Sequence, residues 1–412
     1  MEHRLKAMLA RGFRQGSVTV TFPSGSVETY GDGTGRACHI RLTDAKAVRE
    51  AWMDPELKIP ELYMQGRLVV EGADIYDFLV LAKKNRAKSF ATLPATAISL
   101  GRIVKRLWRR HVMPEHARRN VAHHYDLDEK LFRFFLDSDL QYSCAYFETG
   151  RETLEEAQLK KKRHLAAKMR LCAGQKILDI GSGWGGMGLY LARLGDADVT
   201  GITLSEEQHR VSNARASEAG MADRVRFVLQ DYRHVDDRFD RIVSIGMFEH
   251  VGQQNYGAYF RKAHALLRDD GLFVLHSIGR AKPNLLDPPF IEKYIFPNGH
   301  IPALSEVLPH IEKARFLIKD IEILTYHYAD TLAEWRRRFR ANREAVVALY
   351  DEAFFRMWDL YLAASEVNFR FGKLHNFQII LSKSHGDSPP SRAFIDRAEH
   401  DLAIKEKAVM PD

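Results

Sequence analysis

The chain has 412 residues, of which 45% are hydrophobic and 28% are charged, and its formal net charge is +7. This length suits two domains better than one, and the composition excludes wholesale disorder. No apolar run approaches the roughly 20 residues of a membrane-spanning helix. The first residues lack the apolar segment and cleavage site of a signal peptide, so we expect a cytoplasmic protein.

The three cysteines, Cys38, Cys144 and Cys172, are widely separated along the chain. This spacing excludes a disulfide framework and a zinc cluster of cysteines. We therefore expect free thiols and no bound metal.

The first 85 residues have the pattern of a small α+β domain. Residues 17–31 predict a β-hairpin with its turn at 23–25. A strand at 37–42, a helix at 45–53, a mixed stretch at 62–72 and a helix at 75–85 follow. Residues 86–118 are expected to form a linker that ends in a basic helix.

Positive charge is concentrated in this linker, where residues 102–119 carry seven basic side chains against Glu115 alone. On a helical wheel the apolar and basic residues separate. One half holds Ile103, Val104, Leu107, Trp108 and Val112, and the other holds Lys105, Arg106, Arg109 and Arg110. This pattern is typical of a helix at the surface of an anionic membrane. A helix packed on its own domain fits the pattern equally well.

A second basic cluster, residues 160–163 (KKKR), falls on a predicted helix. Its local charge suits phosphate groups of nucleic acid or of anionic lipid.

Residues 119–385 alternate between predicted strands and helices. Strands are expected at 176–181, 198–204, 225–231, 238–246 and 271–279, with helices at 186–195 and 205–220 between the first three. This alternation predicts an α/β fold with a doubly wound, Rossmann-like parallel sheet. A helical, aromatic-rich region at 332–371 and a strand at 377–383 complete the domain, and residues 386–412 are expected to be a loosely held polar tail.

A glycine-rich turn joins the first of these strands to the first helix. It contains Asp179, Gly181, Gly183 and Gly185 in the form D-x-G-x-G-x-G. Such a turn lets backbone N–H groups approach a ligand closely, but a dinucleotide loop looks similar. The acid at the strand end favours S-adenosylmethionine, because a carboxylate there can meet the cationic amino-acid part of that cofactor.

The ends of the next two strands carry polar side chains. A dinucleotide site would have an acid at the second strand end to hold the ribose, whereas this sequence has neutral Thr203, Leu204 and Gln208. Gln230 and Asp231 end the third strand and are placed to reach an adenine ring. Ser205 with Gln208 also forms a capping box, so a structural role competes at that turn.

Several longer motifs resemble the cyclopropane-fatty-acyl-phospholipid synthases, within the mycolic acid cyclopropane synthase superfamily of methyltransferases. They occur in the family's order and include HHYDLDEKLF, LQYSCAYF, LDIGSGWGG, GITLSEEQ, LQDYR, FDRIVSIGMFEHVG, LHSIG and KYIFPNGHIP. The front domain also resembles that family's small N-terminal domain, which the shorter mycolic acid enzymes lack.

The resemblance implies that the methyl of S-adenosylmethionine is added to a cis double bond of a phospholipid acyl chain and then closes a cyclopropane ring. It also implies bound bicarbonate as the general base. Carried over residue by residue, the holders of this ion are Cys144, Glu249, His276, Ile278 through its backbone, and Tyr328, with Tyr326 nearby. Tyr142 and Ser143 match family residues that touch the cofactor. The implied setting is the inner face of the cell membrane, with no nucleic acid partner and a homodimer as in family members.

Aromatic faces can stabilise the carbocation of such a reaction. The candidates are Tyr125, Tyr146, Phe147, Tyr232, Phe248, Tyr294 and Phe296, most of which also fit a hydrophobic core.

Three alternative functions are compatible with the sequence. Without ring closure, the same cation would yield a methyl-branched or methylated unsaturated acyl chain. A small-amine N-methyltransferase and a non-catalytic lipid-binding protein are the other two.

Overall fold

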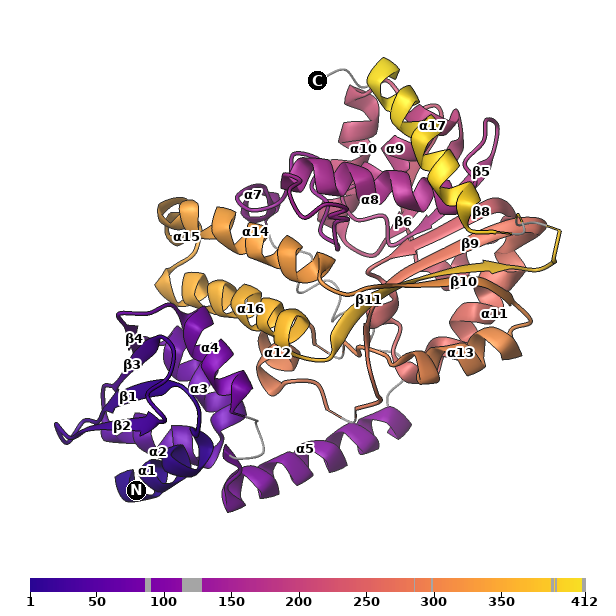
Figure 1. Ribbon diagram of the computed structural model, residues 1–412. Coiled ribbons are helices and arrows are strands. Elements are labelled where there is room, and N and C mark those ends of the chain that lie inside the picture. Colours follow the sequence, from indigo (N-terminus) through magenta and orange to yellow (C-terminus); the bar gives the residue numbers. More distant parts are fainter. Residues whose placement is uncertain are drawn as a thin grey trace. The chain divides into compact units, whose positions relative to one another are not determined.

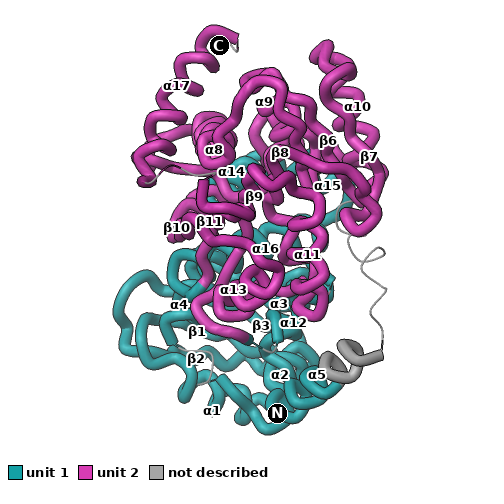
Figure 2. Tube along the Cα trace, turned by 90° about the vertical axis from the view of Figure 1, so that its right-hand side faces the viewer, with its two compact units in different colours: residues 1–114, 284–297, 332–373 teal, residues 115–283, 298–331, 374–412 magenta. Residues whose placement is uncertain are grey.

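The computed structural model describes residues 1–85, 90–112, 128–284, 286–297, 299–386, 389 and 391–409; within helix α5, nothing is said of the side chains of residues 105–112. The chain forms two compact units (Figure 2). The first comprises residues 1–114, 284–297 and 332–373, and the second comprises 115–283, 298–331 and 374–412. No described helix is both long and apolar enough to cross a membrane.

The first unit contains a four-stranded sheet in the order β2-β1-β3-β4. Its strands are β1 (Ser17–Thr21), β2 (Val27–Gly31), β3 (Ala37–Leu42) and β4 (Leu68–Glu71). The predicted hairpin is present, with Val18 opposite Tyr30. Helices α1 (Glu2–Gly12), α2 (Ala45–Met53), α3 (Pro55–Met64), α4 (Ile75–Lys84) and α5 (Leu93–Val112) belong to the same unit.

Two later segments pack with this N-terminal module. They contain α12 (Pro289–Tyr294), most of α14 (His327–Ala341), α15 (Arg343–Leu349) and α16 (Glu352–Phe371). Ion pairs hold them: Lys293 lies 2.6 Å from buried Glu61, and buried Arg336 pairs with Asp359 at 2.7 Å and with Asp74. The compact unit is thus larger than residues 1–85, because segments within the expected catalytic range join it. The four-part domain division stays a prediction.

Helix α5 differs from the expected linker. It begins at Leu93, so most of the stretch expected to be irregular is helical. The side chains of Leu93, Leu100 and Val104 are 89%, 58% and 66% exposed, and they fall on one stripe of the helix. Arg102 lies on another side and pairs with Asp54 at 2.5 Å.

The second unit is built on a seven-stranded sheet in the order β10-β11-β9-β8-β5-β6-β7 (Figure 1). Its strands are β5 (Lys176–Ile180), β6 (Asp198–Thr203), β7 (Val225–Leu229), β8 (Phe239–Ile245), β9 (Leu267–Arg280), β10 (Leu317–Leu324) and β11 (Leu374–Ser382). Strands β9-β8-β5-β6-β7 are parallel, and β11 is antiparallel to both β9 and β10. The predicted doubly wound α/β fold is confirmed.

Helices cover both faces of this sheet (Figure 1). One face carries α8 (Leu154–Lys168), α9 (Gly186–Gly195) and α10 (Glu206–Glu218), and the other carries α11 (Tyr256–Leu266) and α13 (Leu304–Lys313). A short helix, α7 (Glu129–Arg133), and the one-turn helices η2 (Tyr232–His234), η3 (Phe248–His250) and η4 (Gln253–Asn255) lie in connections. The central strands are rich in apolar residues because both faces of the sheet are buried.

The C-terminal segment corrects an expectation. Instead of a loose tail, residues 393–409 form helix α17 (Ala393–Val409), which packs on α8 and α9. Ile395, Leu402 and Glu406 of this helix are buried. Glu406 pairs with Arg163 and accepts a hydrogen bond of 2.6 Å from the Tyr190 hydroxyl. Charged residues separate the few apolar residues of this helix, so its sequence shows no clear amphipathic pattern.

Candidate active site

A cavity opens at the carboxyl ends of the parallel strands in the second unit. The ends of β5, β6, β7 and β8 all contribute to its wall. In the strand order, β5 and β8 lie where the chain reverses its direction of winding, and this switch point is the usual ligand site of open α/β sheets. Ten predicted cofactor residues line the cavity: Tyr142, Ser143, Asp179, Gly181, Gly183, Thr203, Leu204, Gln208, Gln230 and Asp231.

Asp179 lies near the end of β5, and its side chain is buried in the cavity wall. Its Oδ2 atom has no hydrogen-bond partner among the described residues. Burial raises the pKa of this carboxyl to about 7. A buried carboxylate that lacks a partner fits the ammonium group of an amino acid, because the cation would restore the missing interaction.

The glycines of the turn have two different roles. Gly181 and Gly183 line the cavity with φ of 85° and 52°, and a Cβ at Gly181 would lie 2.7 Å from Met247. Gly185 does not line the cavity. It begins helix α9 with φ of 87°, and a Cβ there would lie 2.8 Å from Phe227, so close packing of helix on sheet requires this glycine.

The second and third strand ends are already hydrogen-bonded. Thr203 Oγ1 donates to Gln208 Oε1 at 2.8 Å, and Ser205 Oγ accepts from the Gln208 amide as an N-cap. Burial raises the pKa of Asp231, but Arg233, which donates to both carboxylate oxygens, outweighs this and lowers it overall. These hydrogen bonds hold the side chains in place, so that they can bind an uncharged part of a ligand.

Helix α8 clamps the segment that carries Tyr142 and Ser143. Gln158 donates from Nε2 to the carbonyls of Gln141 and Ser143 at 3.2 and 3.0 Å. One turn later, Lys161 donates to Gln141 Oε1 at 2.5 Å and to Ser143 Oγ at 2.8 Å. Cys144 follows directly, so this clamp also sets the position of the thiol.

Glu249 and Ile278 are in direct contact behind the cavity wall. The Ile278 amide on β9 donates to Glu249 Oε1 at 2.6 Å. Glu249 Oε2 is buried and has no hydrogen-bond partner in the described part of the chain. Burial raises the pKa of Glu249 to about 7. The backbone donor that we expected to bind the anion is thus engaged by Glu249, since the one-turn helix η3 brings that carboxylate onto β9.

His276 lies two residues before Ile278 and so on the same face of β9. It is buried, and desolvation lowers its pKa well below the usual value. Its Nε2 and Nδ1 atoms each lie 3.2 Å from the side-chain amide of a β11 residue, Asn376 and Gln378 respectively. The ring is therefore neutral and fixed on both sides.

Cys144 and Tyr328 lie on two segments that are hydrogen-bonded to each other. Ala145 N–H donates to Thr331 Oγ1 at 3.0 Å, and Phe147 N–H donates to His327 Nδ1 at 3.0 Å. These bonds flank Tyr328 on the first turn of α14. Tyr328 is 9% exposed whereas Tyr326 is 55% exposed, which supports the choice of Tyr328. Burial strongly raises the pKa of the Cys144 thiol, which therefore stays protonated.

The structure brings the predicted cofactor residues together, and two of the predicted anion residues adjoin them along the chain. The cofactor residues line the cavity, while Cys144 and Glu249 are the chain neighbours of the lining residues Ser143 and His250. Three groups fit a small anion that carries a hydroxyl: the Glu249 oxygen that lacks a partner, the Cys144 thiol, which contacts the Ala145 carbonyl at 3.3 Å, and the neutral His276 ring. The sequence did not single out Gln158, Lys161, Asn376 or Gln378, which act through contacts between distant segments.

The candidate aromatic residues have diverse positions. Tyr232 lines the cavity, whereas Phe248 is stacked on Tyr256 in the core. Tyr146 is stacked between His164 and His327. Tyr294 donates to Glu61 within the first unit, and Tyr125 lies outside the described residues.

The parallel sheet, the glycine turn after its central strand and the cavity at the strand ends define a class I S-adenosylmethionine-dependent methyltransferase. The family model described as mycolic acid cyclopropane synthetase matches residues 113–379, and a domain of unknown function matches residues 4–93. The chain belongs to the mycolic acid cyclopropane synthetase family, which confirms the resemblance that the motifs indicated.

Curated relatives include a "Probable fatty acid methyltransferase" of Pseudomonas putida, 39% identical over 65% of this chain and 70% of the relative. The "Cyclopropane-fatty-acyl-phospholipid synthase" of Escherichia coli K12 is 41% identical over 63% of this chain and 66% of the relative. The alignment therefore spans about two thirds of each of these proteins.

Solved structures agree with this assignment. The cyclopropane synthase MmaA2 of Mycobacterium tuberculosis has a TM-score of 0.63 and 32% identity, covering 66% of this chain and 99% of that one. The mycolic acid cyclopropane synthase CmaA1, complexed with S-adenosylhomocysteine, has a TM-score of 0.62 and 33% identity over the same shares. A coclaurine N-methyltransferase has a TM-score of 0.64 at 21% identity, which shows only a shared fold.

Proposed function

We propose that this enzyme adds a methylene unit from S-adenosylmethionine to the cis double bond of an unsaturated phospholipid acyl chain and closes a cyclopropane ring. Bound bicarbonate is the general base in this proposal, held by Cys144, Glu249, His276 and Tyr328, with Ile278 acting through the bond from its amide to Glu249. The observation that carries it is the buried polar group directly behind the cofactor cavity, centred on the contact of Glu249 with Ile278. The phospholipid substrate follows the name of the Escherichia coli relative.

The reaction needs a methyl donor and a base, which S-adenosylmethionine and bicarbonate supply when bound. The chain's task is to hold these groups in a dry site, because an alkene is a weak nucleophile. Asp179 would bind the ammonium of the cofactor. Ser143 and Cys144, fixed by the α8 clamp, connect the cofactor cavity with the anion site.

The protonation states of the residues suit a bound anion. Neutral His276 and the Cys144 thiol are hydrogen-bond donors that carry no charge of their own. A protonated thiol is also a poor nucleophile, so it would not trap a carbocation. Glu249, with its pKa raised to about 7, can accept the hydroxyl proton of bicarbonate and so keep the ion's basic oxygens available.

Substitution of Glu249 tests this role. Glu249→Gln keeps the shape and can still accept from the Ile278 amide, but it cannot accept the bicarbonate proton as a carboxylate. We expect turnover on vesicles of unsaturated phospholipid to fall by on the order of a hundredfold or more, with binding of S-adenosylhomocysteine unchanged by calorimetry. Full turnover by Glu249→Gln would contradict the proposal.

A second outcome is methylation without ring closure, as the names of two relatives suggest. One is the Pseudomonas putida protein, and the other is a "Tuberculostearic acid methyltransferase" of Mycobacterium tuberculosis, 37% identical over 67% of this chain. Mass spectrometry of lipids from an expression host that lacks such enzymes separates the products. A ring gives one added CH2 unit and no reducible double bond, whereas a methylated alkene keeps a reducible one.

We also propose that α5 binds the inner face of the cell membrane. Its exposed stripe of Leu93, Leu100 and Val104 supports this, because apolar side chains at a helix surface insert into the lipid interface. The sequence continues this helix with Lys105, Arg106, Arg109 and Arg110, whose charge suits anionic lipid. Homodimer formation stays a prediction.

A further inference from the structure

The inner face of α8 carries three buried basic side chains at one-turn spacing. They are Lys161, His164 and Lys168, which are 0%, 3% and 0% exposed. Lys161 belongs to the clamp described above. The other two lie further along the helix, beneath the strands that carry the anion site.

Lys168 is connected to His276 through one side chain. Its Nζ donates to Gln378 Oε1 at 2.6 Å, and Gln378 Nε2 lies 3.2 Å from His276 Nδ1. Gln378 is the residue of β11 that pairs directly with His276 of β9. All three side chains are buried.

These contacts determine which nitrogen of His276 carries the proton. An ammonium group can only donate, so the atom of Gln378 that faces Lys168 must be the amide oxygen. The other end of that amide is then the NH2 group, which donates to His276 Nδ1. Because Nδ1 accepts, the proton of the neutral ring resides on Nε2.

The Nε2 side of the ring lies beside β11. Its neighbour there is Asn376, which pairs in register with Ile278, the residue whose amide donates to Glu249. Asn376 Oδ1 is buried and has no hydrogen-bond partner among the described residues. With its amide oxygen turned toward the ring, Asn376 would accept the Nε2 proton as long as no anion is bound, and this deficit would disappear.

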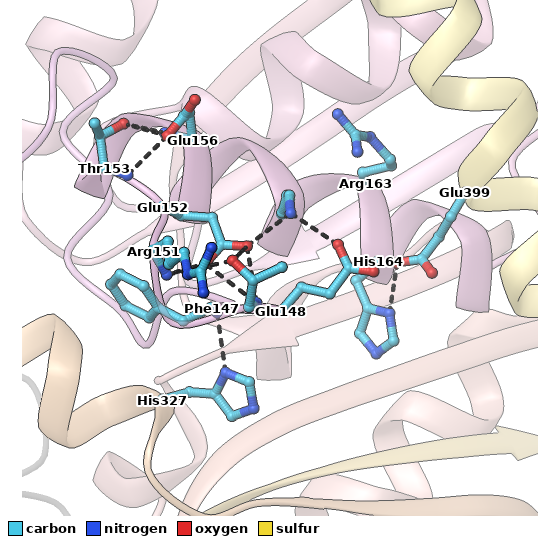
Figure 3. A network of polar contacts seen from close by, with 12 residues as sticks. Phe147, Glu148, Arg151, Glu152, Thr153, Glu156, Arg163, His164, His327 and Glu399 are labelled. Atoms are coloured by element: carbon cyan, nitrogen blue, oxygen red, sulfur yellow. Dashed lines mark hydrogen bonds and ion pairs between the residues drawn. The ribbon is translucent and has the colours of Figure 1, made fainter.

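Lys168 is itself held by a charged network. It pairs with Glu322 of β10, which also bonds His164 Nε2 at 2.7 Å, and His164 Nδ1 bonds Glu399 of α17 at 2.7 Å. Figure 3 shows His164 and Glu399 facing each other. The network holds the Lys168 ammonium next to Gln378, and the Glu322 carboxylate balances its charge.

We propose that Lys168 is a positioning residue that fixes the side-chain amide of Gln378 and thereby keeps His276 in the tautomer protonated on Nε2. This inference rests on the proposed function, in which His276 donates to the bound anion. Neither Lys168 nor Gln378 touches the reacting atoms.

Gln378→Glu is the sharpest test, since it preserves the shape and the contact with Lys168. A carboxylate can only accept, so it would draw the His276 proton to Nδ1. We expect the 15N spectrum of selectively labelled His276, assigned with His276→Gln, to change from the Nε2–H to the Nδ1–H pattern. We expect kcat to fall by on the order of ten- to a hundredfold, with KM for S-adenosylmethionine unchanged.

Lys168→Met provides a second variant, in which the Gln378 amide can rotate and both tautomers should appear. Lys162→Met is the matched control, because Lys162 is also buried on α8 but pairs with Asp139. An unchanged tautomer in Gln378→Glu, or native kcat in both variants, would overturn the inference. If His276→Gln were fully active, the proposed function would fail while the tautomer measurement still tested the role of Lys168.

Discussion

Two basic clusters look alike in the sequence and differ in the structure. On α8, the cluster of residues 160–163 is turned toward the protein: Lys160 pairs with Glu148 and Glu152, Lys161 is buried, Lys162 pairs with Asp139, and Arg163 pairs with Glu406. The expectation that this cluster suits external phosphate groups is wrong, because its charges are used internally.

The α5 helix has the opposite arrangement. Its apolar residues Leu93, Leu100 and Val104 are exposed, and the described charge, Arg102, pairs with Asp54. The side chains of residues 105–112 and the chain at 113–127 lie outside the described residues, so the rest of the basic stretch stays a prediction. The comparison teaches that the charge of a helix reveals little about its partner until the packing is known.

The largest expected effect is a loss of protein stability when a buried charge on α8 is reversed. Lys162→Glu would place a second carboxylate beside Asp139 in a buried position. We expect the free energy of unfolding to fall by on the order of 3–5 kcal/mol, measured by urea denaturation. Leu100→Glu on α5 is the control and should change it by less than about 0.5 kcal/mol. Equal effects would remove the distinction between the two helices.

The next effect concerns membrane binding by α5. Reversing the charge of Arg106, Arg109 and Arg110 together should weaken binding to anionic vesicles by about 1 kcal/mol per residue. Sedimentation with vesicles of increasing phosphatidylglycerol content measures it, and added salt should reduce the wild-type affinity. Arg163→Glu on α8 should leave vesicle binding intact. If it were the variant that lost binding, α8 and not α5 would face the lipid.

The smallest effect is a pH dependence of stability at His164. Burial lowers the pKa of this imidazole, but its bonds to Glu322 and Glu399 outweigh burial and raise it overall. The stabilisation is therefore complete below the unfolded pKa of about 6.5 and is lost as the pH rises through the higher folded value.

His164→Gln should accordingly be less stable than wild type by on the order of 2 kcal/mol at pH 6. The gap should narrow toward pH 9, as thermal unfolding across this range would show. A gap that widens with pH would mean that His164 is neutral in the folded protein.

Much of the fold was predictable because local patterns encode it. The alternation of strands and helices indicated a parallel sheet, and the glycine turn predicted a cofactor site at the end of β5, where the cavity lies. Helix α17 escaped prediction because its few apolar residues are separated by charged ones, two of which, Glu399 and Glu406, pair with side chains of α8 and α9. The joining of residues 284–297 and 332–373 to the first unit depends equally on long-range ion pairs.

The sequence by itself determined the class of enzyme and predicted the cofactor residues and the candidates for anion binding, because short motifs fix the residue types at the strand ends. Only the tertiary structure decided which partners each side chain meets. It assigned the Ile278 amide to Glu249, gave Gly185 a packing role, turned the α8 lysines inward and joined Lys168 to His276 through Gln378. The physical reason is that burial and hydrogen bonding, which set pKa values and tautomers, arise from segments far apart in the chain.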